Sequence, residues 1–383
     1  MIAQAMRGLY YARVNQDKTS SLGVIQKIRG QVRALEALGA GMDSIWLGNR
    51  GVWRNGVIRL PIPLRPPLWS YLFYALVLDW LLARRIDFRH FDFIYIRYPL
   101  ATPGFLYLLR RAKRQQAQLR IILEFPTFPY DRELSEKGLF YQAALWLDRR
   151  CRAKLAPLAD YAVHFGPEMQ LLNIPCINLS NGIDISQFPP ARRTPSGGTL
   201  RLIAVASWNT WHGLDRLIRG MAAYHPVRDK GPLVHLTVVG EGPELPRLQE
   251  LASSLGLEGQ VQFAGARSGP ELDTYFDQAD IGIGTLAIFR KGIQADCSLK
   301  HREYCARGIP FILSSEDPDF PAALPFVHRV APEEAPVAIP EIIRFFTTLT
   351  ANHADYPERM RRYACDHLGW EKRMEAVLQA INA

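Results

Sequence analysis

Short apolar runs alternate with longer amphipathic segments along the whole chain. In the first half, the strand-like runs occupy residues 7–14, 43–49, 91–98, 119–126 and 160–165. In the second half, they occupy residues 200–207, 234–240, 260–265, 281–286 and 309–314. Strand-like runs that alternate with helix-like segments are typical of parallel sheets with crossover helices. The pattern therefore predicts an α/β fold with two doubly wound parallel sheets, one in each half.

Two of the amphipathic segments carry end signals. The first stops at Gly39 and places five apolar side chains on one helical face, at Ile25, Ile28, Val32, Leu35 and Leu38. The second begins at Ser268, where Pro270 lies within the first turn and Glu271 completes a capping-box signature. Both segments are predicted to be helices.

The periodicity stops at residues 188–198, "FPPARRTPSGG". Prolines and glycines without periodicity are typical of a linker. The predicted domains are therefore residues 1–187 and residues 199–367. A chain of 383 residues that is 48% hydrophobic can build two ordinary domains with full-sized cores.

The longest apolar run, Leu68–Ala83, is shorter than the roughly 20 residues of a membrane-spanning helix, and Asp79 interrupts it. We expect it not to cross a bilayer. Two interpretations stay open: a core helix of a large domain, or an aromatic-rich helix that rests on a membrane surface with Arg84 and Arg85 at its end.

The charge is unevenly distributed. Residues 1–190 carry 25 Lys and Arg against 14 Asp and Glu, a net charge of +11, whereas residues 191–383 carry 21 against 23, a net charge of −2. Basic clusters at residues 110–114 and 149–154 are expected either to attract anionic lipid, a phosphorylated acceptor or nucleic acid, or to be solvated helix faces.

The five cysteines are scattered and lack metal-ligand spacing, so neither disulfides nor a zinc site is supported. The N-terminus has no basic region followed by a long apolar core, the pattern of a signal peptide. Both observations favour a reducing, cytoplasmic location.

The stretch "CSLKHREYCARGIPFI", residues 297–312, is predicted to be a short helix between a loop and a strand. Ser298 is placed to cap it, Gly308 to end it, and Lys300 and Glu303 lie one turn apart on one face. At the mouth of a parallel sheet, a lysine suits a diphosphate and a carboxylate suits two ribose hydroxyls. The alternative is an intrahelical surface ion pair.

These residues resemble a known motif. Residues 298–300, 303–304 and 306–310 are similar to the nucleotide-sugar motif of the group-1, or family 4, retaining glycosyltransferases. Further similar segments follow the family's order: residues 181–184, 213–215, 239–243, 260–280 and 369–381. The resemblance covers nearly all of residues 180–383, whereas the first half matches only loosely, through its opening strand and the loop to Gly23.

The resemblance implies the GT-B fold, in which two Rossmann-like domains face each other across a cleft and the C-terminal helix, residues 368–383, packs back on the first domain. It implies a nucleoside diphosphate sugar as donor and a sugar or lipid-linked acceptor. No Asp-x-Asp signature is present, so we expect no metal, and no cofactor beyond the donor substrate. On the family's pattern, donor contacts fall at Ser298, Gly213, Gly240 and Arg267.

The chain departs from that family at three positions. Where relatives place an Arg and a Lys for the diphosphate, Ser207 and His212 stand here, with Trp208 and Trp211 as an expected stacking surface. The first of two family glutamates is Ala295, with Asp296 beside it as a candidate replacement. Charge compensation is then expected to rest on Lys300, and ribose binding on Glu303.

The first half offers other acceptor-side candidates. Glu124 and Asp131 lie in "LEFPTFPYDRE", after a predicted strand, where a carboxylate could orient an acceptor hydroxyl or take its proton. The alternative is a proline-shaped loop in which Tyr130 packs and Asp131 caps. Arg97 and Lys27 are comparable acceptor or phosphate candidates with a surface role as the alternative.

Three functions remain. The first is a metal-independent glycosyltransferase of cell-surface polysaccharide or glycolipid assembly, at the inner face of the cytoplasmic membrane with peripheral contact to anionic lipid. The second is a catalytically reduced nucleotide-sugar-binding accessory protein, which the three departures favour. Nucleic-acid binding is the third, but it lacks a motif or an aromatic platform.

Overall fold

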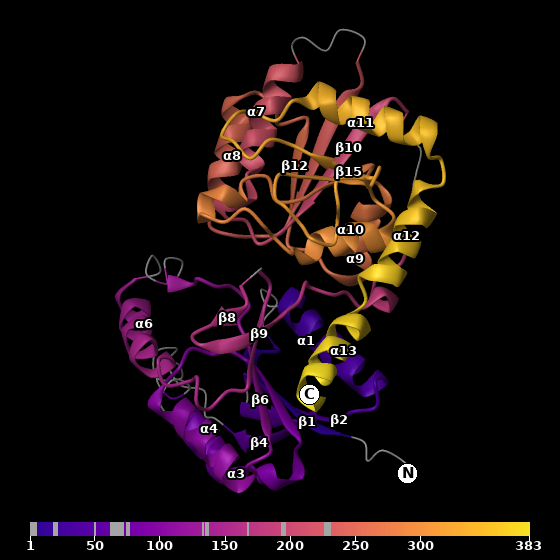
Figure 1. Cartoon of the computed structure of the whole chain (residues 1–383). Coiled ribbons are helices and arrows are strands. Elements are labelled where there is room, and N and C mark those ends of the chain that lie inside the picture. Colours follow the sequence, from indigo (N-terminus) through magenta and orange to yellow (C-terminus); the bar gives the residue numbers. More distant parts are fainter. Residues whose placement is uncertain are drawn as a thin grey trace. The chain divides into compact units, whose positions relative to one another are not determined.

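A computed structural model describes residues 6–17, 22–49, 51–61, 73, 77–131, 134, 138–166, 168–192, 197–225 and 231–383 (Figure 1). The chain forms two compact units. The first unit comprises Met1–Ser180 together with Trp370–Ala383, and the second comprises Asn181–Gly369.

The first unit is built on a nine-stranded sheet with the order β4-β3-β2-β1-β5-β6-β7-β9-β8. Its six central strands pair in parallel. They are β2 (Gly41–Gly48), β1 (Arg7–Asn15), β5 (Phe93–Arg97), β6 (Arg120–Glu124), β7 (Tyr161–His164) and β9 (Ile174–Asn178). Antiparallel strands extend both edges: β3 (Gly51–Arg54), β4 (Val57–Pro61) and β8 (Gln170–Leu171).

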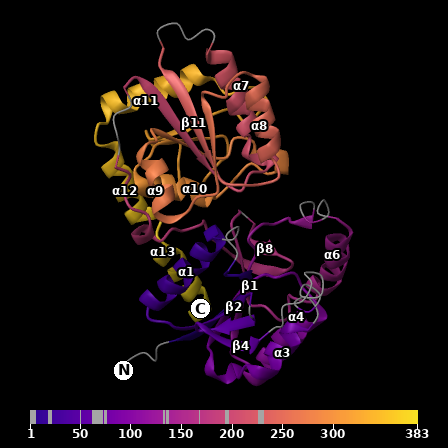
Figure 2. The same ribbon diagram turned by 180° about the vertical axis from the view of Figure 1, so that it is seen from behind.

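Helices cover both faces of this sheet because the crossovers leave β1 in opposite directions. One layer contains α1 (Leu22–Ala37) and α13 (Trp370–Asn382), which lie side by side in both views (Figures 1 and 2). The other layer contains α3 (Leu78–Arg85), α4 (Pro103–Gln115) and α6 (Leu139–Arg152), with the 3-10 turn η2 (Phe88–His90) between α3 and β5. Each layer has its own core of buried apolar side chains.

Helix α1 confirms the first predicted helix. Ile25, Ile28 and Leu35 are buried in the core that α1 shares with α13, whereas Leu38 lies just beyond the helix end. Gly30 lets the two helices approach, because a methyl group there would overlap the indole ring of Trp370.

The second unit has a six-stranded sheet, all parallel, with the order β12-β11-β10-β13-β14-β15. Its strands are β10 (Thr199–Val205), β11 (Leu233–Val239), β12 (Val261–Gly265), β13 (Ile281–Ile283), β14 (Phe311–Leu313) and β15 (Val327–Arg329). The helices are α7 (Leu214–Tyr224), α8 (Leu245–Ser254), α9 (Gly269–Asp277), α10 (Leu299–Arg307), α11 (Ile339–Asn352) and α12 (Tyr356–His367). Short 3-10 turns are η3 (Ile185–Gln187), η4 (Thr210–His212) and η6 (Ile288–Lys291). The predicted fold of two parallel-sheet α/β domains is confirmed.

Two local expectations need correction. Helix α9 begins where predicted, but Ser268 makes no side-chain capping bond, so its hydroxyl does not form the capping box. The chain also enters the second unit at Asn181, before the predicted linker begins at residue 188. Ile183 donates its N–H to the Leu368 carbonyl (2.8 Å) and Ala191 to that of Arg307 (2.9 Å), so hydrogen bonds tie this segment to the second unit.

Only part of the long apolar run, Leu68–Ala83, lies among the described residues; residues 68–72 and 74–76 lie outside them. In the described part, Leu78 and Leu82 are buried, while Trp80 is 38% exposed. Asp79 is buried and accepts hydrogen bonds from Tyr11 (2.6 Å) and Arg13. Over the described residues, no helix combines the length and apolarity that spanning a bilayer requires.

Candidate functional site

Helix α10 starts after the loop that leaves the carboxyl end of β13, where open parallel sheets bind ligands. Ser298 occupies its N-cap position with extended dihedral angles, but its side chain makes no capping hydrogen bond. The expectation that Ser298 caps the helix is therefore wrong. The first-turn N–H groups, which no helix can satisfy internally, are not taken by that hydroxyl. At the other end, Gly308 terminates the helix with a φ of 75°, as predicted.

Lys300, in the first turn of α10, has a buried ammonium nitrogen. That nitrogen has no hydrogen-bonding partner among the described residues. Burial disfavours the charged form and lowers the pKa of Lys300 to about 8, although the nearby Asp296 carboxylate opposes the shift. A buried cation beside free helix N–H groups is an arrangement that an anion would complete.

His212, at the end of η4, is a neutral hydrogen-bond donor at the same place. Its Nδ1 lies 3.1 Å from the backbone nitrogen of Asn209 and 3.3 Å from the Asn209 carbonyl oxygen, so it accepts from the N–H in one tautomer and donates to the carbonyl in the other. Burial lowers the pKa of His212 well below its ordinary value, and the charges of Lys300 and Lys291 lower it further. The ring is therefore neutral near pH 7, and the expected contact of His212 with a diphosphate stays a prediction.

Lys291 brings a second cation to this region. Its ammonium group lies over the Trp211 ring, 4.2 Å from the ring centroid. The neighbouring Arg290 fixes the backbone here, because it donates to Asp215 (2.9 Å) on α7 and to the Thr210 carbonyl (2.7 Å) in η4. Turns η4 and η6 are thereby held together.

Trp208 corrects the expected stacking surface. Its side chain is only 1% exposed and belongs to the core of the second unit, so it offers no face to a ligand. The reason is the loop after β11, which packs on Trp208. The backbone N–H of Trp208 donates to the Glu241 carbonyl (2.7 Å), and Gly240 and Gly242 approach the Trp208 residue closely. Of the two tryptophans, Trp211 alone is partly exposed.

The glycines named in the sequence serve close backbone approach. Gly240 has a φ of 117°, and a methyl group there would overlap the carbonyl oxygen of Ala206. Gly213 has a φ of 67°, and a methyl group would lie 2.8 Å from that of Ala287. Both glycines therefore shape the site through the backbone.

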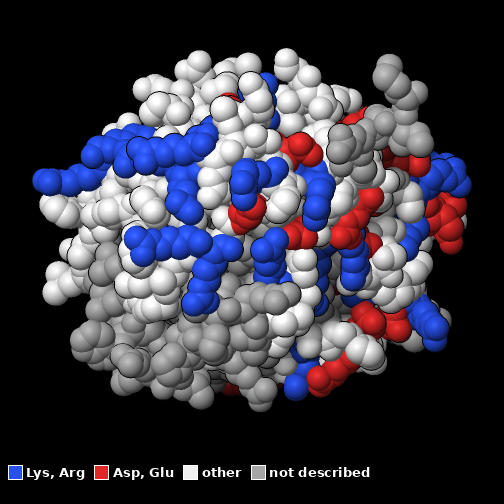
Figure 3. Space-filling view, turned by 90° about the horizontal axis from the view of Figure 1, so that it is seen from below, with Lys and Arg blue, Asp and Glu red and all other residues white. Residues whose placement is uncertain are grey.

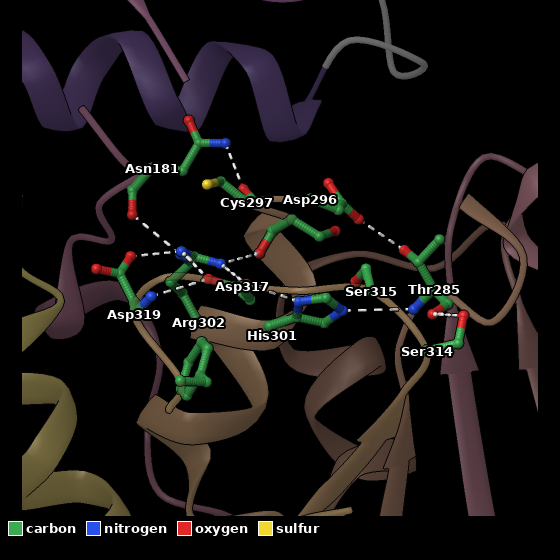
Figure 4. A network of polar contacts seen from close by, with 12 residues as sticks. Asn181, Thr285, Asp296, Cys297, His301, Arg302, Ser314, Ser315, Asp317 and Asp319 are labelled. Atoms are coloured by element: carbon green, nitrogen blue, oxygen red, sulfur yellow. Dashed lines mark hydrogen bonds and ion pairs between the residues drawn. The ribbon is translucent and has the colours of Figure 1, made fainter. Parts of the chain in front are cut away.

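A buried ionic network holds the start of α10 (Figure 4). The Arg302 guanidinium is fully buried and pairs with both oxygens of Asp317, one at 2.7 Å, and with Asp319. It also donates to the carbonyl oxygens of Asn181 (3.0 Å) and Ser298 (3.1 Å). The network positions α10, and Lys300 is not part of it.

His301 continues this network toward the sheet (Figure 4). Its Nδ1 lies 3.0 Å from Asp317, and the Thr285 N–H donates to its Nε2 (3.4 Å). Thr285 in turn donates its hydroxyl to Asp296 (2.9 Å). Burial lowers the pKa of His301, so we assign the neutral ring with its proton on Nδ1. The chain of contacts orients Asp296 beside Lys300.

Glu303 does not pair with Lys300, so the alternative of an ion pair between them is wrong. Its Oε1 accepts from Arg307 (2.9 Å), which also pairs with Asp273 (2.8 Å). Burial raises the pKa of Glu303, although Arg307 opposes the shift. One carboxylate oxygen is thus engaged and the side chain is oriented.

Two further candidates lie on the surface. Ser207 is exposed at the carboxyl end of β10. Arg267 is exposed, and its guanidinium forms an ion pair with Glu271 (3.2 Å) at the start of α9.

Glu124 is a buried anchor and is not open to an acceptor. Its carboxylate is fully buried and receives four contacts: from Lys27 (3.1 Å), Arg97 (2.8 Å), Gln31 (2.6 Å) and Tyr95 (2.8 Å). Burial alone would raise its pKa, but the two cations and the hydrogen bonds lower the pKa of Glu124 to about 2. Such a carboxylate is too weak a base for the predicted role.

Asp131 is likewise engaged. It accepts from Arg152 (2.9 Å) and Arg149 (2.8 Å), and these hydrogen bonds lower its pKa. Tyr130 packs into the core and donates to the buried Asp148 (2.7 Å). The packing alternative for Tyr130 is confirmed, but Asp131 forms ion pairs where capping was expected.

Sequence reasoning missed Arg302, Asp317, Thr285 and Arg290. Asp317 and Thr285 lie in loops without a pattern, and only the fold brings them to α10. One weak signal for Arg302 was present in the sequence: residues 300–302 of the nine-residue helix are all charged or polar, and at about 3.6 residues per turn they span roughly half of its circumference. Among the described residues, no cluster of three or more His, Cys, Asp or Glu side chains is arranged to hold a metal ion.

Residues 199–327 of the 383 match the family model described as glycosyl transferases group 1. This segment runs from β10 into β15, so it spans the sheet of the second unit. No curated protein sequence matches the chain significantly.

Similar solved structures cover nearly the whole chain. A glycosyltransferase from Rickettsia africae has a TM-score of 0.64 at 12% identity, over 99% of this chain and 98% of that one. A sucrose-phosphate synthase from Thermosynechococcus elongatus has a TM-score of 0.65 at 16% identity, over 97% and 98%. The catalytic domain of starch synthase IV from Arabidopsis thaliana, bound to ADP and acarbose, has a TM-score of 0.62 at 12% identity, over 99% and 100%.

These likenesses establish the GT-B fold for the chain. The match to the family model adds that residues 199–327, in the second unit, are similar to group 1 glycosyl transferases.

Proposed function

We propose that the protein is a retaining, family 4 glycosyltransferase that moves a sugar from a nucleoside diphosphate sugar to an acceptor. The observation that carries this proposal lies at the N-terminus of α10. There the ammonium nitrogen of Lys300 is buried and has no partner among the described residues, and the Ser298 side chain does not cap the helix. A diphosphate supplies the anion that this arrangement favours.

The donor would bind along the carboxyl edge of the second sheet. The diphosphate would be contacted by Lys300, by the neutral imidazole of His212 and by the first-turn N–H groups of α10. Lys291 would reach it from its place over Trp211. Glu303 would accept from the ribose hydroxyls through its oxygen that is not bonded to Arg307. Asp296, oriented by Thr285, would contact the transferred sugar. The similar starch synthase structure holds ADP, which is consistent with this donor class.

Catalysis would come from stabilising the leaving group. As the bond to the sugar breaks, negative charge develops on the diphosphate, and fixed donors that need no reorganisation stabilise it. We propose retention of configuration, with the acceptor hydroxyl attacking from the face that the diphosphate leaves. The proposal needs no metal and no cofactor, because Lys300, Lys291 and His212 supply positive charge and hydrogen bonds.

The acceptor would be a sugar or a lipid-linked sugar bound by the basic first unit. We place the reaction in the assembly of cell-surface polysaccharide or glycolipid, in the cytoplasm at the inner face of its membrane. The net charge of +11 over residues 1–190 favours an anionic acceptor or surface.

Transfer from a panel of labelled nucleotide sugars tests the proposal, with Lys300→Ala and Glu303→Ala beside the wild type. We expect each variant to lose at least tenfold in kcat/KM, with a larger loss for Lys300→Ala because it removes charge from the leaving group. Lys372→Ala, an exposed lysine on α13, is the matched control and should stay within twofold. Unchanged transfer in both site variants would overturn the assignment.

One observation favours a second function, a nucleotide-sugar-binding accessory protein with reduced turnover. The loop after β10 offers an exposed serine and a neutral histidine at Ser207 and His212. Calorimetry separates the two functions: the accessory protein would bind a nucleotide sugar without transfer to any acceptor. Any turnover that Lys300→Ala abolishes would eliminate it.

A further inference from the structure

The outer helix layer of the first unit has an unusual charge composition. Helices α3, α4 and α6 together contain nine Lys and Arg residues and two Asp or Glu residues. The basic residues are Arg84, Arg85, Arg110, Arg111, Lys113, Arg114, Arg149, Arg150 and Arg152. Such an excess on one layer produces a positive potential that attracts anions.

Both acidic residues of these helices are withdrawn from the surface. Asp79 is buried and accepts from Tyr11 and Arg13. Asp148 is buried and accepts from Tyr98 (2.5 Å) and Tyr130 (2.7 Å). Neither carboxylate is therefore presented on the outer surface of the layer.

Some of the basic side chains have structural partners, and others do not. Arg111 donates to the Ala83 carbonyl (2.7 Å), Lys113 pairs with Asp160 (2.7 Å), and Arg149 and Arg152 hold Asp131. Among the described residues, four exposed arginines of the layer have no acidic partner: Arg84, Arg110, Arg114 and Arg150.

Two of these arginines lie on exposed tryptophans. Arg84 lies over the ring of Trp80 at 3.7 Å, and Arg150 over the ring of Trp146 at 4.1 Å. Each pair is spaced four residues apart, so each occupies one outward helix face. Trp80 is 38% and Trp146 is 55% exposed, although tryptophan normally buries most of its surface. We call Trp80, Arg84, Arg110, Arg114, Trp146 and Arg150 the Trp–Arg face.

Figure 3 views the molecule from below the orientation of Figure 1. Long Lys and Arg side chains project toward its left, the side on which Figure 1 places α4 and α6, and few acidic side chains lie among them. The excess of positive charge is therefore a feature of the surface as well as of the composition.

We propose that the Trp–Arg face docks the protein on an anionic lipid bilayer. Tryptophan and arginine both combine an apolar body with a polar end, which suits the boundary between headgroups and acyl chains. The unpaired arginines match the negative charge of anionic headgroups, each adding about fivefold to the partition coefficient. A stacking platform for nucleic-acid bases places aromatic rings along one groove, whereas Trp80 and Trp146 lie on separate helices and each has an arginine over its ring.

Co-sedimentation with vesicles tests this docking without donor or acceptor. Wild-type protein should bind phosphatidylcholine vesicles that contain about 25% phosphatidylglycerol. It should bind vesicles of pure phosphatidylcholine weakly or not at all. Replacing Arg84, Arg110, Arg114 and Arg150 together by Gln should lower the partition coefficient at least 50-fold. The matched control replaces four exposed cations elsewhere by Gln, Arg192, Arg344, Arg362 and Lys372, and should stay within threefold.

A second variant addresses the tryptophans. Trp80→Ser with Trp146→Ser should weaken binding to the anionic vesicles about tenfold and remove the blue shift of tryptophan fluorescence on binding. Circular dichroism checks that each variant is folded. Equal binding to neutral vesicles, an equal loss in the control variant, or salt-dependent binding to a DNA or RNA oligonucleotide without vesicle binding would each overturn the proposal. Because no sugar transfer is measured, the result is independent of the proposed enzymatic function.

Discussion

Two side chains near the start of α10, Lys300 and His212, have lowered pKa values, and a bound anion would raise both. The ammonium nitrogen of Lys300 is buried, and its charge adds to the desolvation that lowers the pKa of His212. Glu124 is the opposite case, because its four contacts leave a satisfied carboxylate with a pKa of about 2. At the scale of single residues, the proposed binding group is the charge without a partner among the described residues, Lys300, and the structural group is the charge with four partners, Glu124.

The first prediction concerns the pH dependence of Lys300. Its pKa is about 8 in the folded protein and 10.5 without perturbation, so between these values the unfolded chain binds more protons and stability rises with pH. Lys300→Met should therefore raise the free energy of unfolding at pH 7, on the order of 1–2 kcal/mol. Urea denaturation at pH 7 and pH 10 measures this, and the gain should be clearly smaller at pH 10.

The same group should control donor affinity. Above pH 8 the free protein loses the Lys300 charge, so we expect the wild type to bind nucleoside diphosphate more weakly as the pH rises. Lys300→Arg keeps its charge and should show a flatter profile by calorimetry. A wild-type affinity that is constant from pH 7 to pH 10 would contradict this account of the site.

At the scale of elements, the site depends on loops that pack on one another. The loop after β11 crosses the loop after β10 at Gly240 and Gly242, and Arg290 ties η6 to η4. The Arg302 and His301 network then sets the start of α10. The proposed donor contacts therefore depend on packing between loops.

The second prediction tests the crossing at Gly240. Gly240→Ala introduces a methyl group against the Ala206 carbonyl at a φ of 117°, and should lower the free energy of unfolding by about 3 kcal/mol and weaken donor binding. Gly256→Ala is the matched control, because Gly256 also has a positive φ but nothing within 4 Å of the added methyl group. It should lower stability by about 1 kcal/mol and leave donor binding intact. Equal effects in denaturation and calorimetry would argue against a steric role.

At the scale of the whole molecule, the chain crosses between its units at two points. It enters the second unit at Asn181 and returns to the first at Trp370, so that α13 completes a core begun by α1. Leu368 and Trp370 are two residues apart yet belong to different cores. The stability of the first unit therefore depends on the last residues of the chain.

The third prediction uses that neighbouring pair. Trp370→Ala should lower the stability of the first unit by about 3–5 kcal/mol, and Leu368→Ala should lower that of the second by about 2–5 kcal/mol. Hydrogen exchange separates the two variants. Trp370→Ala should speed amide exchange in β1 and β5, and Leu368→Ala should speed it in β13 and β14. If both variants destabilised the same strands, the assignment of α13 to the first core would be wrong.

The sequence alone determined the two parallel α/β sheets, the helix at α1 and the start and end of α10. These follow from the spacing of apolar residues and from Gly308, which are local properties of the chain. It also pointed to Lys300, although the residues alone left a surface ion pair with Glu303 equally open, and the resemblance to the family motif favoured the diphosphate role.

Only the tertiary structure decided which polar groups are satisfied. From the sequence, Glu124 and Asp131 were candidate bases. In the structure, arginine and lysine side chains from distant parts of the sequence pair with them. Trp208 looked like a stacking surface until the β11 loop covered it. The pairing of these carboxylates and the burial of the Trp208 ring depend on neighbours that folding brings together, and no local sequence pattern specifies those neighbours.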